Sequence, residues 1–330
     1  MIISRTPLRI SFVGGGTDLP GFCDVHGGAV VSTTIDKWIH VIVARRFEGD
    51  VRVGYSRTEI VPKASDVQHE LVREAMRATG IPRGVDVMTL ADVPSQGTGL
   101  GSSSTVTVGL LNALYAFQGI YRSPASLAEE ASHIEIEVLG KPIGRQDQYA
   151  AAIGGLNLIE FLPAEGGVRV EPVLMPPGCL KRLHRSLLLF YTGRQRQASS
   201  VLEQQRSAVA DGTAVETLLQ MRDLAYSLRE RLSAGDVDAV GRLLHENWEL
   251  KKGLVDIISS AEVDRWYDLG RHAGATGGKV LGAGGGGFLM LFAEPARHDA
   301  IRRALSELRE VPMKFSARGT HIAVFTDADE

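Results

Sequence analysis

The chain has 330 residues, of which 44% are hydrophobic and 23% are charged, and its formal net charge at pH 7 is −3. This length corresponds to one or two domains, and the composition is that of a globular protein with a hydrophobic core. Binding to nucleic-acid phosphates needs a basic face, and the net negative charge argues against such binding. Two cysteines are too few for a disulfide framework or a thiolate metal site, so the sequence also argues against these.

The first half of the chain mixes strand and helix patterns. Two β-branched, apolar runs at 29–34 and 38–47 flank a polar pair at 36–37 and predict a hairpin. A Ser-Pro pair at 123–124 is typical of a helix start, and the helix is expected to end near Leu139. The other predicted elements are strands at 2–12, 51–55, 59–61, 85–90 and 156–161, helices at 68–79 and 103–118, and a helical turn at 144–152.

Proline and glycine are concentrated between residues 163 and 178, which predicts a boundary between two domains, 1–175 and 176–330. Strands and helices come in groups rather than in strict alternation, so the expected fold class is α+β. The predicted elements after the boundary are strands at 186–191, 288–292, 313–315 and 321–325 and helices at 199–210, 215–233, 237–252, 261–273 and 296–308.

The sequence carries no targeting or membrane signal. Its N-terminus lacks a basic region followed by a long apolar stretch, and no apolar run is long enough to cross a bilayer. We therefore expect a reduced, cytoplasmic protein without a membrane partner.

The segment from Pro94 to Thr105 is the most informative part of the chain. Glycines stand at alternate positions, Gly97, Gly99 and Gly101, and three serines and a threonine follow them. Glycine lets the backbone approach a ligand closely, and hydroxyl residues suit a helix N-terminus, where backbone N–H groups lack partners. The pattern predicts a loop and helix start that bind an anion, most often a phosphate.

Three common nucleotide-binding loops do not fit. The lysine that ends a Walker A loop is absent after the glycines. The second glycine cluster, with Gly282, Gly284 and Gly287, satisfies a G-x-G-x-x-G spacing, but a predicted strand follows it where a dinucleotide fold needs a helix. The His-Arg-Asp and Asp-Phe-Gly elements of protein kinases are also absent.

Three motifs in a set order resemble those of the GHMP small-molecule kinases, the group of galactokinase, homoserine kinase, mevalonate kinase and phosphomevalonate kinase. The first, at 6–20, contains Pro-x-Arg and Thr-Asp; the second is Gly-Leu-Gly-Ser-Ser at 99–103; the third is the lysine and glycine cluster at 279–287. The resemblance implies a two-lobed α+β kinase fold with ATP and Mg²⁺ between the lobes. The N-terminal lobe would be ribosomal S5 domain 2-like and the C-terminal lobe ferredoxin-like.

The resemblance also assigns the nucleotide and metal sites. The loop residues expected to bind ATP are Pro94, Gly97, Gly99, Leu100, Gly101, Ser102, Ser103 and Ser104. Ser103 and Glu135 are the expected Mg²⁺ ligands, because a glutamate twelve residues before the catalytic aspartate has this role in galactokinases. Glu137 is the rival, but two residues apart on a helix point to different faces, so only one of the two glutamates can face the site.

Two residues are expected to carry the chemistry. Asp147 lies in a Gly-x-x-Asp-Gln element like that of the family, and it would accept or orient the proton of the attacking sugar hydroxyl. Arg9 matches the arginine of the first motif, and it would pair with Asp147 or with the transferring phosphate. Without the resemblance, Asp147 would be read as a helix cap and Arg9 as an exposed strand residue.

The expected acceptor site is built from the first and third motifs and one further element, around Arg194 and Arg196. Its predicted residues are Gly15, Gly16, Thr17, Asp18, Arg196, Gly284 and Gly285. Galactokinases carry Glu-His where this chain has Gly15 and Gly16, which removes hexose contacts and makes room for a bulkier or phosphorylated sugar, with backbone N–H groups facing its anion. Arg194 is an additional cation nearby, and Lys279 is left open between a phosphate contact and a surface lysine.

The first motif and residues 143–152 resemble the D-glycero-D-manno-heptose 7-phosphate 1-kinase branch of the family. The resemblance implies phosphorylation of the anomeric hydroxyl of heptose 7-phosphate, so the expected partner is a sugar or sugar phosphate. Three alternatives stay open: a kinase of an unphosphorylated sugar such as L-fucose, a kinase of another acceptor such as an isoprenoid alcohol or homoserine, and a non-catalytic binding protein. The sequence leaves a homodimer open as well.

Overall fold

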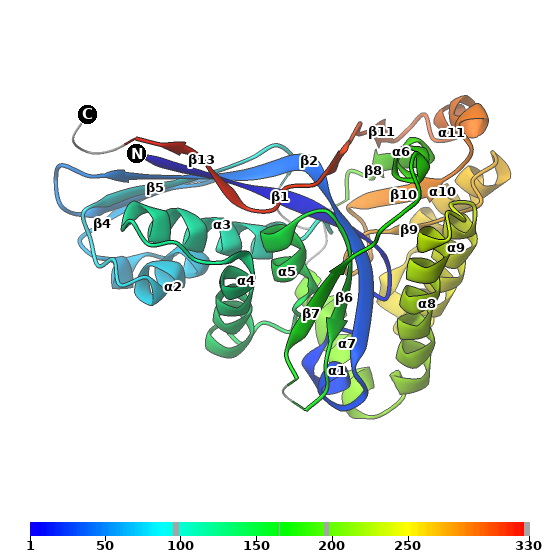
Figure 1. The fold of residues 1–330 in the computed structure, drawn as a ribbon, viewed down its shortest axis with the longest axis horizontal. Coiled ribbons are helices and arrows are strands. Elements are labelled where there is room, and N and C mark those ends of the chain that lie inside the picture. Colours follow the sequence, from blue (N-terminus) through cyan, green and yellow to red (C-terminus); the bar gives the residue numbers. More distant parts are fainter. Residues whose placement is uncertain (95–98, 165, 195–197, 327–330) are drawn as a thin grey trace.

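The computed structural model describes residues 1–94, 99–164, 166–194 and 198–326. The chain folds into two sheets with helices packed on them (Figure 1). The strands are β1 Ile2–Val13, β2 Gly28–Arg45, β3 Val51–Gly54, β4 Thr58–Val61, β5 Val85–Ala91, β6 Leu156–Phe161, β7 Val168–Pro172, β8 Leu187–Tyr191, β9 Gly277–Val280, β10 Phe288–Phe292, β11 Arg309–Glu310, β12 Phe315–Ser316 and β13 His321–Phe325. The α-helices are α1 Pro20–His26, α2 Glu70–Ala78, α3 Ser102–Phe117, α4 Pro124–Ser132, α5 Gln146–Ile153, α6 Cys179–Arg185, α7 Ala198–Ala210, α8 Val215–Ser233, α9 Ala239–Lys252, α10 Ala261–His272 and α11 His298–Ala304.

The larger sheet belongs to the N-terminal lobe. Its strands follow the order β13-β1-β2-β5-β3-β4, with β6 and β12 also paired to β2, and β7 paired to β6. The predicted hairpin at 29–47 is wrong, because β2 runs without interruption through the polar pair at 36–37. The C-terminal segment supplies the reason: Asp36 N donates to Lys314 O and Lys314 N donates to the Asp36 carboxylate, so backbone pairing continues where a turn was expected.

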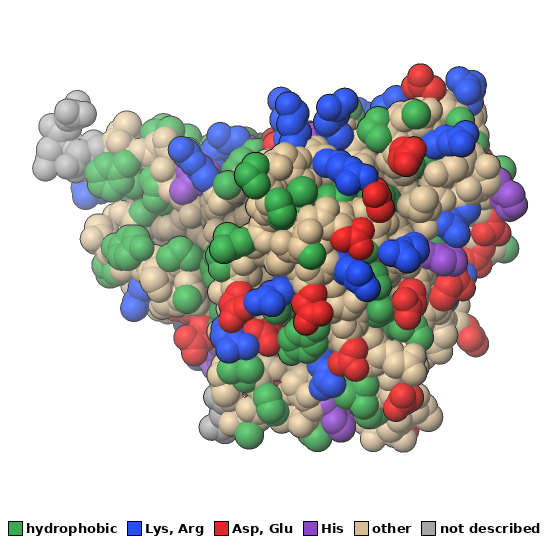
Figure 2. All heavy atoms as spheres, turned by 45° about the vertical axis from the view of Figure 1, so that its right-hand side comes forward, with side chains coloured by type: hydrophobic (Ala, Val, Ile, Leu, Met, Phe, Trp, Pro, Cys, Tyr) green, Lys and Arg blue, Asp and Glu red, His purple; other side chains and the backbone are tan. Residues whose placement is uncertain are grey.

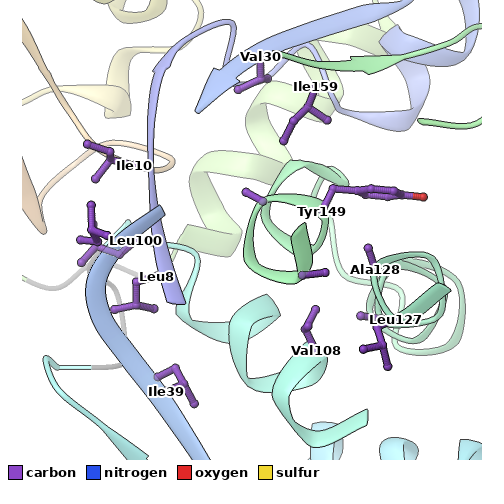
Figure 3. Close-up of a cluster of buried hydrophobic side chains, with 14 of the residues drawn as sticks. Leu8, Ile10, Val30, Ile39, Leu100, Val108, Leu127, Ala128, Tyr149 and Ile159 are labelled. Carbon is purple, nitrogen blue, oxygen red and sulfur yellow. The ribbon is translucent and has the colours of Figure 1, made fainter. Parts of the chain in front are cut away.

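Helix α3 lies against this sheet and positions the glycine–serine segment. Figure 1 shows α2, α3, α4 and α5 grouped on one side of the sheet, and α3 contacts both β1 and β2. Gly109 in α3 allows this close approach, since a Cβ there would lie 2.9 Å from Thr6 Oγ1. In Figure 3, Leu100 lies beside Leu8 and Ile10 of β1, and all three side chains are buried. The apolar residue of the loop therefore anchors it in the core.

The helix predicted from 123 to 139 changes its winding midway. Helix α4 ends at Ser132, and a π-helical turn, His133–Val138, follows it. A π-turn inserts an extra residue into the helical repeat and is frequent at functional sites. Glu135 in this turn is completely buried, whereas Glu137 is exposed, so the two glutamates face different surroundings.

The smaller sheet has the order β11-β8-β10-β9, and α9 packs against β9 as well as against β1 of the larger sheet. The last strands return to the N-terminal lobe, where β12 pairs with β2 and β13 with β1. Strand β7 lies within the proline- and glycine-rich segment that was predicted as the boundary. The division at residue 175 remains a prediction, and the two sheets with their helices have the α+β character that the sequence predicted.

Candidate active site

The described part of the glycine–serine segment forms the start of α3. Gly101 is the N-cap with a left-handed backbone, φ 76°, and as a glycine it has no side chain to satisfy the first N–H groups of the helix. Those N–H groups and the helix dipole suit a phosphate. Pro94 is exposed at the entrance to the loop, while the predicted Gly97 lies outside the described residues.

The third motif packs directly on this loop. Gly99 has φ 76°, and a Cβ on it would collide with Leu281 O, while a Cβ on Gly282 would collide with Gly99 Cα. Two backbones can come this close only where both residues lack side chains. Gly284 and Gly285, predicted to bind the acceptor, pack on Ile258 instead of on the loop, and Gly285 N donates to Ile258 O at 2.8 Å.

Arg9 and Asp147 are brought together from β1 and α5. Arg9 Nε donates to Asp147 Oδ1 at 2.7 Å and Nη2 donates to Oδ2 at 2.8 Å, a bidentate ion pair. Arg9 Nη1 also donates to Gly99 O at 2.6 Å, and Arg9 N donates to Leu100 O. Arg9 is 4% exposed and the Asp147 side chain 24%, so the carboxylate has an open side next to the loop. Gly101 keeps that side open, because a Cβ there would lie 3.1 Å from Asp147 Oδ2.

Glu135 faces the serines at the start of α3. Its Oε2 accepts from Ser103 Oγ at 3.1 Å, its Oε1 accepts from Gln148 Nε2 at 3.1 Å, and the Ser104 hydroxyl also bonds the carboxylate. Burial raises the pKa of Glu135 above its usual range. Lys141 Nζ lies 3.7 Å from Glu135 Oε2, so an ammonium ion shares this corner of the site.

The Ser103 hydroxyl and the Glu135 carboxylate fit a magnesium ion chemically, since Mg²⁺ prefers hard oxygen ligands and takes few of them from the protein. Across the described residues no group of three or more His, Cys, Asp and Glu side chains is arranged to hold a metal. Such an ion would therefore complete its coordination with phosphate oxygens and water. The assignment of these two residues as ligands remains a prediction.

The first motif forms the turn between β1 and α1. Asp18 is 2% exposed; its Oδ1 accepts from Gly16 N at 3.1 Å and from Gln146 Nε2 at 2.8 Å. Burial, and then the charge of Asp147, raise the pKa of Asp18. The Thr17 hydroxyl is fully buried and bridges the N–H and C=O of Ala29, so Thr17 holds the turn in place and does not present its hydroxyl to a ligand.

Gly15 and Gly16 leave the turn without side chains beside Asp18. A Cβ on Gly15 would lie 3.6 Å from Ser11 Oγ and 3.8 Å from Gln146 Nε2, so a side chain there would point at polar groups around Asp18. Gly16 has φ 113°, which favours glycine. Gly15 and Gly16 are the two positions at which the sequence predicted room for an acceptor.

Of the two arginines predicted near the acceptor, Arg194 belongs to the described residues. Arg196 lies outside the described residues. Arg194 forms an ion pair with Glu262, and both line a pocket of about 770 Å³ that also contains Gly285 and Trp266. The pocket lies on the C-terminal lobe, between the third motif and the start of α10.

Sequence reasoning missed three polar residues near Asp18 and Asp147 and left the role of a fourth, Lys279, open. Gln146 bonds Asp18, Asn247 Oδ1 accepts from Gly14 N at 2.9 Å, and Lys251 Nζ donates to Gly282 O at 2.7 Å. Lys279 is completely buried and its Nζ donates to Phe12 O at 3.2 Å, so the surface-lysine interpretation is wrong. The sequence offered little signal for the first three: Lys251 and Lys252 resemble the lysines that commonly end a helix.

Comparison with known proteins identifies the class. The GHMP kinases N terminal domain model matches residues 67–155, and the GHMP kinases C terminal model matches residues 224–310. The chain belongs to the GHMP kinase family.

Within that family, one relative is similar over nearly its whole length. The D-glycero-alpha-D-manno-heptose 7-phosphate kinase of Campylobacter jejuni is 31% identical over 96% of each chain. The crystal structure of a D-glycero-D-manno-heptose 1-phosphate kinase from Bacteroides thetaiotaomicron superposes with a TM-score of 0.81, at 27% identity over 99% of this chain and 100% of that one. A bifunctional fucokinase/GDP-fucose pyrophosphorylase of Arabidopsis thaliana is 27% identical over 93% of this chain, which spans 31% of that protein. These relationships support an ATP-dependent sugar kinase.

The surface adds little to the question of macromolecular partners. Figure 2 shows basic and acidic side chains interspersed across the middle of one face, which is not the basic patch that nucleic-acid binding requires. A search of the described helices finds none with the length and apolar character needed to cross a bilayer. The absence of nucleic-acid and membrane partners remains a prediction.

Proposed function

We propose that this protein transfers the γ-phosphoryl group of ATP to the anomeric hydroxyl of D-glycero-D-manno-heptose 7-phosphate, with Mg²⁺ as the metal. The observation that carries the proposal is the 31% identity to the Campylobacter jejuni heptose 7-phosphate kinase over 96% of both chains. The paired Arg9 and Asp147 beside the start of α3 support it chemically. Such a kinase would work in the cytoplasm, where ATP is available.

Positioning and charge neutralisation account for most of the catalysis in phosphoryl transfer. The N–H groups at the start of α3 would hold the ATP phosphates, and bound Mg²⁺ would neutralise charge on those phosphates beside Ser103 and Glu135. Asp147 would take or orient the proton of the attacking hydroxyl on its open side. Arg9 fixes the orientation of the Asp147 carboxylate through two charge-assisted hydrogen bonds and ties it to the loop through Gly99 O.

Asp18 and its neighbours would bind the acceptor. Gln146 donates to Asp18 through both its backbone N–H and its side-chain amide, which orients the carboxylate. Gly144 makes room for this arrangement, since a Cβ there would collide with Asp18 Oδ2. A carboxylate held in this way can accept hydrogen bonds from sugar hydroxyls through its remaining lone pairs.

The two heptose-kinase names differ in the phosphate position that they mention, so the position must be tested directly. We would incubate the protein with ATP, Mg²⁺ and each member of a panel: heptose 7-phosphate, the unphosphorylated heptose, L-fucose, galactose, mevalonate and homoserine. ADP release identifies the acceptor. A phosphate on the anomeric oxygen is released by mild acid, whereas a primary phosphate ester survives it. We expect release of ADP with heptose 7-phosphate and an acid-labile product.

The second candidate function is phosphorylation of an unphosphorylated sugar, which the Arabidopsis thaliana fucokinase relative favours. Turnover of L-fucose with inert heptose 7-phosphate would select this candidate. ATP binding without turnover of any acceptor would select the non-catalytic binding protein. Either result would reject the heptose 7-phosphate proposal.

A further inference from the structure

Helix α9 brings two buried polar side chains to the first motif. Asn247 and Lys251 are four residues apart, so they lie on the same face of the helix. Asn247 Oδ1 accepts from Gly14 N, and Lys251 Nζ donates to Gly282 O. This face of α9 therefore touches the first motif at one residue and the third motif at the other.

Both side chains have unused hydrogen-bonding capacity. Asn247 is completely buried, and in the described part of the chain its Nδ2 has no hydrogen-bond partner. Lys251 is 3% exposed, and its ammonium group, which has three N–H donors, makes one hydrogen bond to the described residues. Gln146, whose Nε2 donates to Asp18, has a buried Oε1 that is also without a partner among these residues. Buried polar groups are normally satisfied, so two unpartnered amide atoms on side chains that contact the Gly14–Asp18 turn, together with the two spare N–H donors of Lys251, indicate a missing polar ligand.

Lys251 lies among the charged residues of the site, Asp18, Asp147 and Arg9. Burial lowers the pKa of Lys251 to about 8, while the carboxylates of Asp18 and Asp147 act to raise it and Arg9 acts to lower it. Burial, and then the charges of Lys251 and Arg9, lower the pKa of Lys279, so this second buried lysine lies close to Lys251. Arg9 is already paired with Asp147, and Asp18 accepts hydrogen bonds from Gly16 and Gln146, so Lys251 retains a charge without a close carboxylate partner.

We propose that Lys251 contacts the acceptor substrate, donating a charge-assisted hydrogen bond to an acceptor oxygen next to Asp18, and that Asn247 positions the Gly14 turn and offers its Nδ2 to the same ligand. This inference rests on the proposed function, since it takes the Asp18 turn to be the acceptor site. The chemistry favours an acceptor rich in hydroxyl or phosphate oxygens. Through this contact, helix α9 of the C-terminal lobe would take part directly in the selection of the acceptor.

The test compares Lys251→Met with Lys252→Met. Lys252 is the matched control, because its ammonium pairs at 2.9 Å with Glu249 on the same helix and its side chain is 27% exposed. With the acceptor that the wild type turns over, we expect Lys251→Met to raise the acceptor KM about 10- to 100-fold, as for loss of a charged hydrogen bond. The ATP KM and the circular dichroism spectrum should stay as in the wild type. Lys252→Met should leave all of these unchanged.

The pH profile separates substrate contact from a structural role. In the wild type, kcat/KM for the acceptor should fall as pH rises through about 8, when Lys251 loses its proton. This limb should persist in Lys252→Met and disappear in Lys251→Met. A lysine that only braces Gly282 predicts a raised ATP KM with an unchanged acceptor KM, and that result would overturn the proposal.

Failure of the heptose assignment can be told apart from failure of this proposal. If the wild type phosphorylates another small molecule, the assignment is wrong, and the two lysine variants are compared on that molecule. An unchanged acceptor KM and an unchanged alkaline limb in a folded Lys251→Met protein would refute the Lys251 contact whatever the acceptor. If the wild type phosphorylates none of the panel and binds none of it by calorimetry, both proposals are rejected.

Discussion

Replacing Asp147 with asparagine tests the centre of the proposed mechanism. The change keeps the size of the side chain but removes its charge and one acceptor oxygen. Arg9 would keep its bond to Gly99 O but lose a bidentate carboxylate partner, with hydrogen bonds now of 2.7 and 2.8 Å. The guanidinium is 4% exposed, so it would stay buried without a counter-ion.

The structure sets the scale of two separate effects. Breaking a fully buried ion pair costs about 3–5 kcal/mol, but the Asp147 side chain is 24% exposed, so water can replace part of the loss and we expect about 2–3 kcal/mol in the free energy of unfolding. Removing a general base lowers the rate by about 10²–10⁴-fold. The fall in kcat should therefore exceed what a modest loss of stability explains in a protein that is still folded at the assay temperature.

The assay is ADP release under saturating ATP and acceptor, with urea unfolding measured in parallel. Asp238→Asn is the control, because Asp238 forms an exposed ion pair with Arg182 that should contribute little to stability and nothing to turnover. A double-mutant cycle with Arg9→Met should show that the two substitutions are not additive, since the residues are in contact. A kcat for Asp147→Asn within about threefold of the wild type would refute the assignment of Asp147 as base or positioner.

Two further predictions concern the buried charges of the site. Glu135→Gln should raise the Mg²⁺ concentration needed for half-maximal activity at least about tenfold, while exposed Glu137→Gln should leave it unchanged; equal Mg²⁺ titrations would reject Glu135 as a ligand. Lys251 has a folded-state pKa of about 8, whereas its ordinary value is 10.5. Between these two pH values the unfolded chain binds more protons than the folded one, so the free energy of unfolding should increase as pH rises from 8 to 10.5. This difference in pKa corresponds to on the order of 3 kcal/mol in the free energy of unfolding, and Lys251→Met should remove this part of the pH dependence. If both proteins show the same pH dependence of unfolding across this range, burial does not lower the pKa of Lys251.

The sequence by itself determined the class of protein and the order of its motifs. Local patterns sufficed for the long helices: the predicted helix at 215–233 has the same bounds as α8. The glycine–serine segment also predicted a helix start with a close backbone approach, because only glycine tolerates the left-handed φ of Gly99 and Gly101 without a steric cost. Such features depend on neighbouring residues and can be read from a short window.

Tertiary structure decided what depends on residues far apart in the chain. The polar pair at 36–37 stays in a continuous strand because the segment around Lys314 pairs with it. Buried Glu135 belongs to a π-turn and accepts a hydrogen bond from Ser103 at the start of α3, and a helical pattern does not reveal where such a turn falls. Lys251 looks like a helix-ending surface lysine, and only the packing of α9 against both lobes buries its charge beside Asp18. The sequence gives each residue's type and therefore the functional group that it carries. The folded chain sets the partners of that group, and therefore its electrostatics.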